Sequence, residues 1–290
     1  MPTIAFLASA ATAPDSPTRR DDAFEHDQEV EALGGALSAA GIGLEVLAWD
    51  DPGADWGAFD AAVIRSTWDY WDRQAEFLET LERIEGATRL FNPAALVRWN
   101  SRKTYLRDLE AKGARLIPTL WLEEADAAAC EAAFDALGAE DLVFKRQVGA
   151  GADGQARLQR GEAIPRFPHP MMVQPFLPTI QSEGEFSFVF IDGALSHALI
   201  KRAAAGDYRI QSMYGGVEEA VEPAPADLAA AGAVIEMLDE APLYTRVDMV
   251  RGGDGGLLLM ELELIEPFLY PLQGPELGPR LAAALGRRLG

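Results

Sequence analysis

The fold is decided near the end of the chain by Tyr244-Thr-Arg-Val-Asp-Met-Val250, Gly252-Gly-Asp-Gly-Gly256 and Leu257-Leu-Leu-Met-Glu-Leu-Glu-Leu-Ile265. This stretch predicts two strands joined by a glycine-rich turn. Because side chains alternate between the two faces of a strand, Glu261 and Glu263 project from the same face. If the hairpin closes on the glycines, Asp248 lies opposite Met260 or Glu261.

The three carboxylates of this hairpin would converge on one side of an otherwise apolar ribbon. Like charges that face each other across a sheet are destabilising, so a positive group should neutralise them. Mg²⁺ is the simplest such group, because it takes carboxylate oxygens together with the phosphates of a substrate. The alternative is that the carboxylates lie on the solvated outer face of an edge hairpin. The hairpin alone leaves both interpretations open.

The composition describes a globular chain with a strong acidic bias. Its 290 residues exceed one small core and suit two or three linked lobes. Apolar residues make up 49% and charged residues 24%, which is typical of a folded protein. The formal net charge of −21 argues against nucleic acid or an anionic membrane as the partner, because both are bound by Lys/Arg surfaces. Small phosphates remain compatible, since they need only a local basic pocket.

Cysteine and histidine usage limits the metal chemistry. Cys130 is the only cysteine, which excludes an internal disulfide and a Cys-based metal site, and the three histidines do not cluster. The apolar residues 4–13 end in Ala-Thr-Ala, which resembles a signal-peptidase site, but without a positive n-region they are better explained as a first strand. No run approaches about 18 apolar residues, so we expect no membrane span and a cytoplasmic protein.

The first third of the chain alternates strands with helices. The patterns predict strands at residues 3–9, 44–49, 61–65 and 89–91, and helices at residues 24–40 and 72–85. Such a βαβαβ rhythm predicts a small parallel sheet covered by helices, which is an α/β domain. Functional loops in these sheets lie beyond the carboxyl ends of the strands.

The loop after the third of these strands reads Arg65-Ser-Thr-Trp-Asp-Tyr-Trp71. Polar and aromatic groups at this position are typical of a site for a small polar ligand. Arg65, Thr67 and Tyr70 are therefore candidate substrate-binding residues. A packed surface loop anchored by Trp68 and Trp71 is the alternative.

The order of predicted elements changes after Asn92-Pro93, where the strict alternation of strands and helices ends. Asn100 could cap a helix that runs to residue 112, and a second helix is predicted at residues 125–137. Antiparallel strands follow, with a hairpin turn at Asp192-Gly193, then a helix, the acidic hairpin and a terminal helix. The expected strands are 141–147, 155–159, 171–176, 186–191 and 194–202, and the expected helices are 227–238 and 279–289.

A glycine-rich loop, Gly149-Ala-Gly-Ala-Asp-Gly154, matches the dinucleotide-binding pattern G-x-G-x-x-G. That pattern opens a helix in its usual context, with an acidic residue about 20 positions further on. Here the alternating strand pattern of residues 155–159 follows, and Gln174 stands where the acidic residue would be. The loop is therefore predicted to be a hairpin flap, whose backbone N–H groups can close on phosphates without side-chain hindrance. A plain glycine turn remains an alternative.

Two lysines strengthen the phosphate interpretation. Leu142-Val-Phe-Lys-Arg146 places Lys145 inside an apolar strand just before the flap. Lysine is rarely buried unless it is paired, and a nucleotide phosphate would pair it. Lys103, at the start of the preceding helix, is a second candidate phosphate contact. A snorkelling Lys145 and an ordinary surface Lys103 are the alternatives.

These features occur in the order that defines a known superfamily: Lys103, Lys145, the glycine flap, Met172-Val-Gln-Pro-Phe176, an arginine-bearing loop, Asp248 and Glu261-Leu-Glu263. In number and order they resemble the ATP-grasp superfamily, with an arrangement similar to that of prokaryotic glutathione synthetases. Three phrases resemble the ATP-grasp ligases of D-cycloserine biosynthesis: Arg65-Ser-Thr-Trp-Asp-Tyr70, Asn92-Pro-Ala-Ala-Leu-Val-Arg-Trp-Asn100 and Glu261-Leu-Glu-Leu-Ile-Glu-Pro267.

The resemblance covers the whole chain and implies its domain organisation. Residues 1–95 would form a pre-ATP-grasp α/β substrate domain with a small parallel sheet. An α+β ATP-grasp fold of two lobes with antiparallel sheets would follow. Residues 96–172 would be the small lobe with the glycine flap, and residues 173–290 the large lobe with the metal-binding hairpin.

The resemblance also implies roles for the nucleotide site. Lys103 and Lys145 would contact the α- and β-phosphates, beneath a mobile lid made by the three flap glycines. Gln174 and Phe176 would lie on the hinge, whose backbone reads adenine, and Glu183 would hold the ribose hydroxyls, with Glu185 as an equal choice. The lid glycines are Gly149, Gly151 and Gly154.

Metal and acceptor sites follow from the same comparison. Asp248, Glu261 and Glu263 would hold Mg²⁺, or Mn²⁺ in its place, although many relatives have Asn where Glu263 stands. An arginine before a loop and another after it match Arg202 and Arg209, whose guanidinium groups suit phosphoryl oxygens or a carboxylate. The glycine pair that ends in Gly216 would leave room for the acceptor substrate.

The function implied is an ATP-dependent carboxylate–amine ligase or cyclase that forms a C–N bond on a small amino-acid-like substrate. An acyl phosphate would form and ADP and phosphate would be released, by positioning and charge neutralisation without a side-chain nucleophile. A catalytically silent nucleotide-binding regulatory protein is the alternative. A nicotinamide-dependent oxidoreductase would rest on G-x-G-x-x-G alone. Substrate identity, ligase versus cyclase, one or two metal ions, and a homo-oligomeric state stay open.

Overall fold

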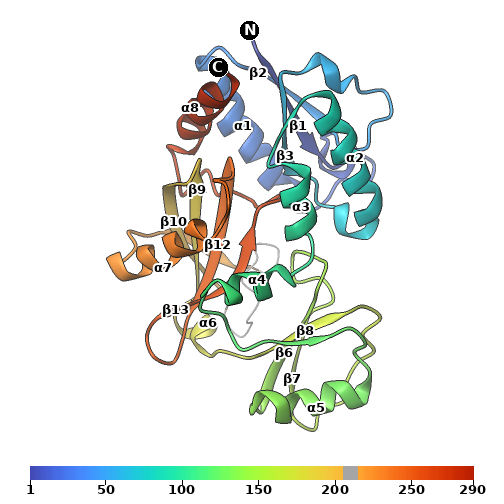
Figure 1. The fold of residues 1–290 in the computed structure, drawn as a ribbon, viewed down its shortest axis with the longest axis vertical. Coiled ribbons are helices and arrows are strands. Elements are labelled where there is room, and N and C mark those ends of the chain that lie inside the picture. The colour runs from blue at the N-terminus through green and yellow to red at the C-terminus, as the bar shows by residue number, and fades with distance from the viewer. Residues whose placement is uncertain (205–214) are drawn as a thin grey trace.

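Three sheets follow one another along the long axis of the molecule (Figure 1). The structure is a computed structural model that describes residues 1–204 and 215–290. A parallel sheet lies at the end that carries both termini, a five-stranded antiparallel sheet lies in the middle, and a smaller antiparallel sheet lies at the far end. The predicted fold class, an α/β domain followed by two antiparallel sheets, is confirmed. None of the helices in this described part is both long and apolar enough to cross a membrane.

The parallel sheet, sheet A, has the strand order β2-β1-β3-β4. Its even-numbered side chains on β1, such as Ile4 and Phe6, pack beneath α1 and α8, whereas Ala5 and Leu7 pack toward α2 and α3. The alternation buries both faces, as expected for a parallel sheet between helices. The elements are β1 (Thr3–Ala8), β2 (Gly43–Ala48), β3 (Ala61–Ser66), β4 (Arg89–Phe91), α1 (Ala23–Ala39), α2 (Gln74–Ala87), α3 (Ala94–Asn100) and α8 (Leu277–Leu289), with 3₁₀ turns at Ala10–Thr12, Trp56–Ala58 and Tyr70–Arg73.

The middle sheet, sheet B, is antiparallel with the order β11-β10-β9-β12-β13. Phe188, Val247 and Leu262 project from one face into a core that is covered by α4 and α7. On the other face, Val189, Ile191 and Leu199 pack into the core shared with α1 and α8. The rest of that face, which includes Ser187 and Asp248, is polar and is called the polar face below. The elements are β9 (Glu185–Ile191), β10 (Ala194–Arg202), β11 (Val217–Ala220), β12 (Tyr244–Arg251), β13 (Leu257–Glu263), α4 (Tyr105–Ala111) and α7 (Pro225–Glu236).

The small sheet, sheet C, has the order β5-β8-β6-β7 and packs on α5. Asp126 caps α5 by accepting the N–H of Ala129 at 2.8 Å, and the helix ends at Gly138 with a φ of 61°. The elements are β5 (Leu120–Leu122), β6 (Asp141–Arg146), β7 (Ala156–Gln159), β8 (Met171–Pro175) and α5 (Ala127–Leu137), followed by the short α6 (Thr179–Ser182). The expected boundary between residues 172 and 173 falls inside β8.

The helix predicted over residues 100–112 is present, but it begins later than expected, at Tyr105. Two short helices, α3 and α4, occupy this region, and Asn100 ends the first instead of capping the second. The Asn100 amide donates to Leu262 O at 2.8 Å and accepts from Leu264 N at 3.1 Å. Its side chain therefore ties α3 to the end of β13, and it is unavailable as a helix cap.

The acidic hairpin is formed by β12 and β13 as predicted. Asp248 pairs directly with Glu261, and the register shifts by one residue between Asp248 and Met249. Gly252 N donates to Gly256 O at 2.8 Å and closes the turn. The shift is a β-bulge, which re-aims the side chains on the strand that carries the extra residue.

Candidate functional site

A pocket lies between the polar face of sheet B and sheet C, and the N-terminal domain closes one end of it. Asp248 on β12 and Lys145 on β6 line opposite walls. Trp68 and Trp71, from the loop after β3, line the N-terminal end. All three parts of the fold therefore contribute side chains to one cavity.

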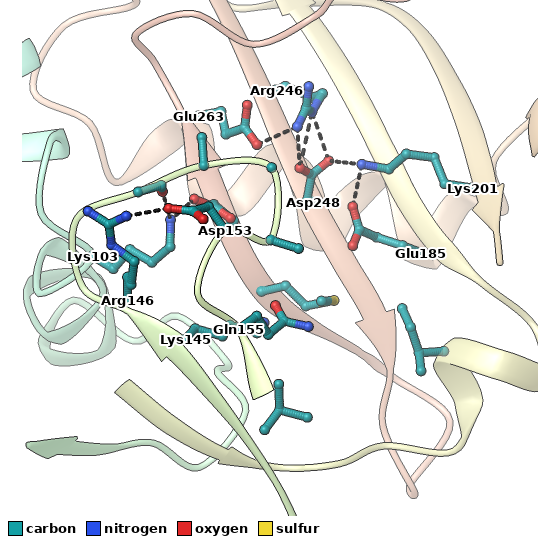
Figure 2. A pocket seen from close by; sticks show the side chains of 18 of the residues that line it. Lys103, Lys145, Arg146, Asp153, Gln155, Glu185, Lys201, Arg246, Asp248 and Glu263 are labelled. Atoms are coloured by element: carbon teal, nitrogen blue, oxygen red, sulfur yellow. Dashed lines mark hydrogen bonds and ion pairs between the residues drawn. The ribbon is translucent and has the colours of Figure 1, made fainter. Parts of the chain in front are cut away.

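The floor of the pocket is a buried network of charges on sheet B (Figure 2). The Arg246 guanidinium donates to both oxygens of Asp248, at 2.9–3.1 Å, and also pairs with Glu263. Lys201 pairs with Glu185 and lies 3.4 Å from Asp248. Burial opposes the ionisation of Asp248, but Arg246 and Lys201 outweigh it and lower the pKa of this carboxyl.

Lys103 connects the floor to the glycine flap. Its Nζ pairs with Glu261 and donates to Gly149 O at 2.9 Å. Burial alone would lower the pKa of Lys103, but the facing Glu261 carboxylate raises it. Lys103 is thus held in the pocket by two groups of opposite walls.

Lys145 has no such partner. Its side chain lines the pocket, and no residue in the described ranges 1–204 and 215–290 is within hydrogen-bond or ion-pair distance of its Nζ. Figure 2 shows Lys145 without a dashed contact, beside the fully connected floor. Burial lowers the pKa of Lys145, which is the expected response of an ammonium group that lacks a counter-charge.

The glycine loop is the connection between the antiparallel strands β6 and β7, so the predicted hairpin flap is confirmed. Gly149 and Gly151 line the pocket, and Gly151 has a φ of 63°, in the left-handed region that favours glycine. Gly154 has a φ of 65° but does not line the pocket. A Cβ there would lie 3.0 Å from Arg146 Cδ, whose guanidinium pairs with Asp153 across the flap.

Gln174 carries a second unsatisfied group. Thr119 Oγ1 donates to Ile117 O at 2.7 Å, so this hydroxyl can only accept from Gln174 Nε2, at 2.9 Å. The orientation of the amide is therefore fixed by the network. Its Oε1 atom is buried without a hydrogen-bond partner, on a side chain that lines the pocket.

Phe176 follows on the same segment and also lines the pocket. The Arg157 guanidinium lies 3.4 Å from the centre of its ring and is itself paired with Asp141 at 2.6 Å. This cation–π contact with Arg157 stabilises the position of the Phe176 ring. Both hinge residues that the sequence singled out contribute to one apolar wall.

The ribose role expected for Glu183 is not supported by its position. Glu183 is held by Arg251 at 3.1 Å, Arg251 is also held by Asp227, and Glu183 does not line the pocket. Glu185, the equal alternative, is 5% exposed and does line it. Gly184, between these two residues, has a φ of 116°, so the regular alternation of a strand does not extend back to Glu183.

The three predicted metal ligands do line the same cavity. Asp248 is 3% exposed, so the alternative of a solvated outer face is wrong for this carboxylate. Within the described residues no three Asp, Glu, His or Cys side chains are grouped closely enough to hold a metal ion. Basic groups occupy their place, because Glu261 is held by Lys103 and Asp248 by Arg246. The donor chemistry fits Mg²⁺, provided that Lys103 releases Glu261.

In the loop after β3, the polar side chains predicted to bind substrate are buried in the N-terminal domain and do not reach the pocket. Arg65 is fully buried, where it pairs with Glu29 at 2.8 Å, and Thr67 is likewise buried. Tyr70 packs against Phe77, with ring centroids 4.9 Å apart. None of the three predicted substrate residues lines the pocket, whereas Trp68 and Trp71 of the same loop do. The interior of the α/β domain takes the polar side chains because Glu29 neutralises Arg65.

The two predicted site arginines and the glycine expected beside the acceptor substrate are not found in the described lining of the pocket. Arg202 pairs with Glu219 on the exposed edge of sheet B and does not line the pocket. Gly216 precedes β11 and is also absent from the lining. Arg209 lies outside the residues that the structure describes.

Two basic residues that the sequence interpretation left unassigned, Arg246 and Lys201, complete the floor. Arg246 stands two positions before Asp248, so strand alternation places both side chains on the same face. Lys201 is the last of four consecutive buried residues of β10, so strand alternation in the sequence does not single it out. A period of two applied to the bases as well as to the acids would have found Arg246.

The chain is similar to known proteins over most of its length. Residues 4–92 match the family model of the D-cycloserine synthetase DcsG N-terminal domain. Over 282 residues the chain is 36% identical to the cycloserine biosynthesis protein DcsG of Streptomyces lavendulae, covering 91% of this chain and 94% of the relative. It is 29% identical over 227 residues to the glutathione synthetase of Prochlorococcus marinus (strain MIT 9313), covering 73% and 69%.

Solved structures agree with the sequence relatives. The crystal structure of D-cycloserine synthetase DcsG superposes with a TM-score of 0.85 at 30% identity, covering 99% of this chain and 100% of that one. The ATP-grasp ligase PsnB, solved with a precursor variant, Mg and ADP, shares the fold at a TM-score of 0.68 and 18% identity, covering 99% and 98%. The chain therefore has the ATP-grasp fold and belongs to the family of the cycloserine biosynthesis protein DcsG.

Proposed function

We propose that this chain is an ATP- and Mg²⁺-dependent carboxylate–amine ligase or cyclase that acts on a small amino-acid-like substrate through an acyl phosphate. The observation that carries the proposal is Lys145, a half-buried ammonium that has no hydrogen-bond or ion-pair partner among the described residues, beneath a glycine flap and opposite a wall of carboxylates. A buried cation without a partner is costly, and nucleotide phosphates would remove that cost.

The other groups of the pocket fit the same ligand. Gln174 Oε1 offers an acceptor to a base with an amino group, and Phe176 offers an apolar face beside it. The backbone of Gly149 and Gly151 can approach phosphates closely because no side chain intervenes. Relatives named for Mg and ADP complexes make the nucleotide a natural first choice.

The reaction would proceed by two displacements. A substrate carboxylate oxygen attacks the γ-phosphorus of ATP, the bond from that phosphorus to its bridging oxygen breaks, and ADP leaves. A nitrogen then attacks the acyl carbon, and inorganic phosphate departs with the electron pair of the acyl–oxygen bond. Lys145 and Arg246 would orient and neutralise the phosphoryl oxygens throughout. Mg²⁺ held by Asp248, Glu261 and Glu263 would supply further neutralisation of the phosphate charge.

Flap closure would protect the intermediate from water. Arg146 pairs with Asp153 across the flap, so this loop is internally braced and can move as a unit over the phosphates. An acyl phosphate that is exposed to water would hydrolyse, and its exclusion favours attack by nitrogen. The substrate carboxylate would enter from the end lined by Trp68 and Trp71, away from the hinge.

The test is product analysis with purified protein, ATP, Mg²⁺ and a panel of small amino acids and their derivatives. The panel includes compounds that carry a carboxylate and a second nitrogen, because the name of the relative, cycloserine biosynthesis protein, suggests ring closure. We expect equal release of ADP and phosphate that depends on substrate, and a hydroxamate when hydroxylamine traps the acyl phosphate. AMP and pyrophosphate as products, or tight nucleotide binding without turnover, would contradict the proposal; the second result would support the regulatory alternative.

A further inference from the structure

The segment that follows β13 is fixed in place by the N-terminal domain. Trp68 Nε1 donates to Glu266 O at 3.1 Å, and Arg65 donates to Pro267 O. Glu29, the partner of Arg65, accepts the N–H of Leu269 at 2.7 Å. Contacts on consecutive backbone groups leave this segment little freedom, so the direction of the Glu266 side chain is set by the fold.

Glu266 lines the pocket and is 9% exposed. Its own backbone N–H favours the ionised carboxylate, but no other residue of the described part of the chain lies within hydrogen-bond or ion-pair distance of it. The carboxylates of the neighbouring floor differ in this respect, because each has a basic partner (Figure 2). Burial raises the pKa of Glu266 to about 7, as expected for an acid without a counter-charge.

A cationic or N–H-donating ligand is the missing partner that this environment would accept. Trp68 and Phe268 line the same end of the pocket, and aromatic faces attract ammonium groups. A phosphate is excluded there by charge, since Glu266 would repel it.

We propose that Glu266 is the binding residue for the amino group of the acceptor substrate, which would therefore be a small molecule with a primary ammonium. This assignment rests on the proposed function, since it names the substrate class of the same pocket. Among the described residues that line the cavity, Lys145 and Glu266 are then the charged groups left for two different ligands. Lys145, on sheet C, would receive the phosphates, and Glu266, beside the N-terminal domain, would receive the nitrogen compound.

The experiment compares matched ligands on protein that is saturated with ADP and Mg²⁺. Serine and alanine, as both enantiomers, are titrated calorimetrically against glycerate and lactate, which replace the ammonium by a hydroxyl group. We expect at least one amino acid to bind about tenfold or more tightly than its hydroxy acid, the effect of a hydrogen bond to a charged group. Glu266→Gln should reduce this preference to about twofold and leave the affinity for ADP unchanged.

Failure of this inference and failure of the proposed function give different results. Equal binding of amino and hydroxy acids, no binding of any amino acid to the ADP complex, or an unaltered preference in Glu266→Gln would overturn the role of Glu266 while nucleotide binding stands. Absence of ADP binding to the wild-type protein would instead overturn the proposed function. Unfolding of the free Glu266→Gln variant serves as a folding control, and it should occur at no lower temperature than in the wild type, because the substitution removes an unpaired buried charge.

Discussion

The two sheets that face each other across the pocket treat buried charge in opposite ways. On sheet B, Asp248 and Glu263 are both held by Arg246, and Lys201 holds Glu185. On sheet C, Lys145 has no partner among the described residues, and Gln174 Oε1 is unsatisfied. The carboxylates of the floor have basic partners before any ligand arrives, whereas Lys145 and Gln174 Oε1 on sheet C have none among the described residues. The difference indicates that the charge pairs of sheet B stabilise the fold in addition to any ligand that they bind, whereas the unpaired groups of sheet C serve ligand recognition.

The largest effect should follow from breaking the floor. Arg246→Ala leaves Asp248 and Glu263 buried without their base, which typically destabilises a protein by about 3–5 kcal/mol. Arg202→Ala is the matched control on the same sheet, since its exposed pair with Glu219 should be worth no more than about 1 kcal/mol. Urea denaturation measures both free energies of unfolding. Similar losses in the two variants would mean that the floor is not the stabilising region.

Catalysis should depend on the carboxylates of the floor. Glu261→Ala is expected to lower substrate-dependent ADP release by about a hundredfold or more, because metal and phosphate neutralisation act on the transition state. The exposed Glu140, which pairs with Arg160 on sheet C, is the control and should tolerate Ala without loss of rate. Activity above about a tenth of wild type in Glu261→Ala would contradict the metal assignment.

Stability should respond to pH in opposite senses at two neighbouring carboxylates. Burial raises the pKa of Glu266 from 4.5 to about 7, so the folded chain holds a proton that the unfolded chain releases. This term lowers stability by up to about 3 kcal/mol as pH rises through that window. Asp248, with a lowered pKa, instead contributes stability above its ordinary pKa of 3.8 that is lost as pH falls.

The test is the difference in unfolding free energy between wild type and each variant, followed from pH 8 down to about pH 2, so that the range includes the acid window in which Asp248 titrates. For Glu266→Gln the difference should grow in favour of the variant as pH rises, because glutamine has no proton to release. For Asp248→Asn the difference should favour the wild type at neutral pH and shrink toward acid. Two parallel curves would show that the paired and unpaired carboxylates do not differ.

Removing the Lys145 ammonium should weaken nucleotide binding without lowering the stability of the free protein. Lys145→Met removes a half-buried ammonium that has no partner among the described residues, so we expect affinity for ADP with Mg²⁺ to fall about tenfold to a hundredfold, the value of a hydrogen bond to a charged group. The free energy of unfolding of the free protein should not decrease, in contrast to Arg246→Ala. Isothermal calorimetry and denaturation on the same samples separate the two. Unchanged nucleotide affinity would reject the phosphate role of Lys145.

The smallest effect concerns the base. Gln174 Oε1 should accept the exocyclic amino group of adenine, so purine riboside triphosphate, which lacks that group, should bind about tenfold more weakly than ATP. Gln174→Met should abolish the discrimination, and Thr119→Val should reduce it by freeing the amide to rotate. Discrimination that survives in Gln174→Met would assign adenine recognition to the backbone alone.

The elements of this fold could be predicted wherever local pattern and tertiary environment agree. The strand at Arg89–Phe91 and the strand at Ala194–Arg202 lie where predicted, because each combines apolar alternation with clear flanking turns. The start of the helix expected over residues 100–112 was predicted incorrectly, because the Asn100 amide is hydrogen-bonded to the distant backbone of β13 and does not cap the helix. A local capping signal cannot reveal that competition.

The site was predictable to the extent that strand alternation determines it. Asp248, Glu261 and Glu263 reach the pocket for that reason, and Lys145 does so on its own strand. The residues of the loop after β3 were not predictable, because the buried pairing of Arg65 depends on Glu29, which lies on another element. Loop side chains take their direction from such long-range partners rather than from the sequence around them.

Lys145 and Gln174 on sheet C are expected to gain their missing partners only when a nucleotide binds. The most direct test is calorimetric binding of the non-hydrolysable analogue AMPPNP, with and without Mg²⁺, to wild type and to Lys145→Met. We predict tight binding that requires Mg²⁺ in the wild type and a loss of at least about tenfold in the variant. Absence of binding to the wild type, or equal binding by both proteins, would contradict the account.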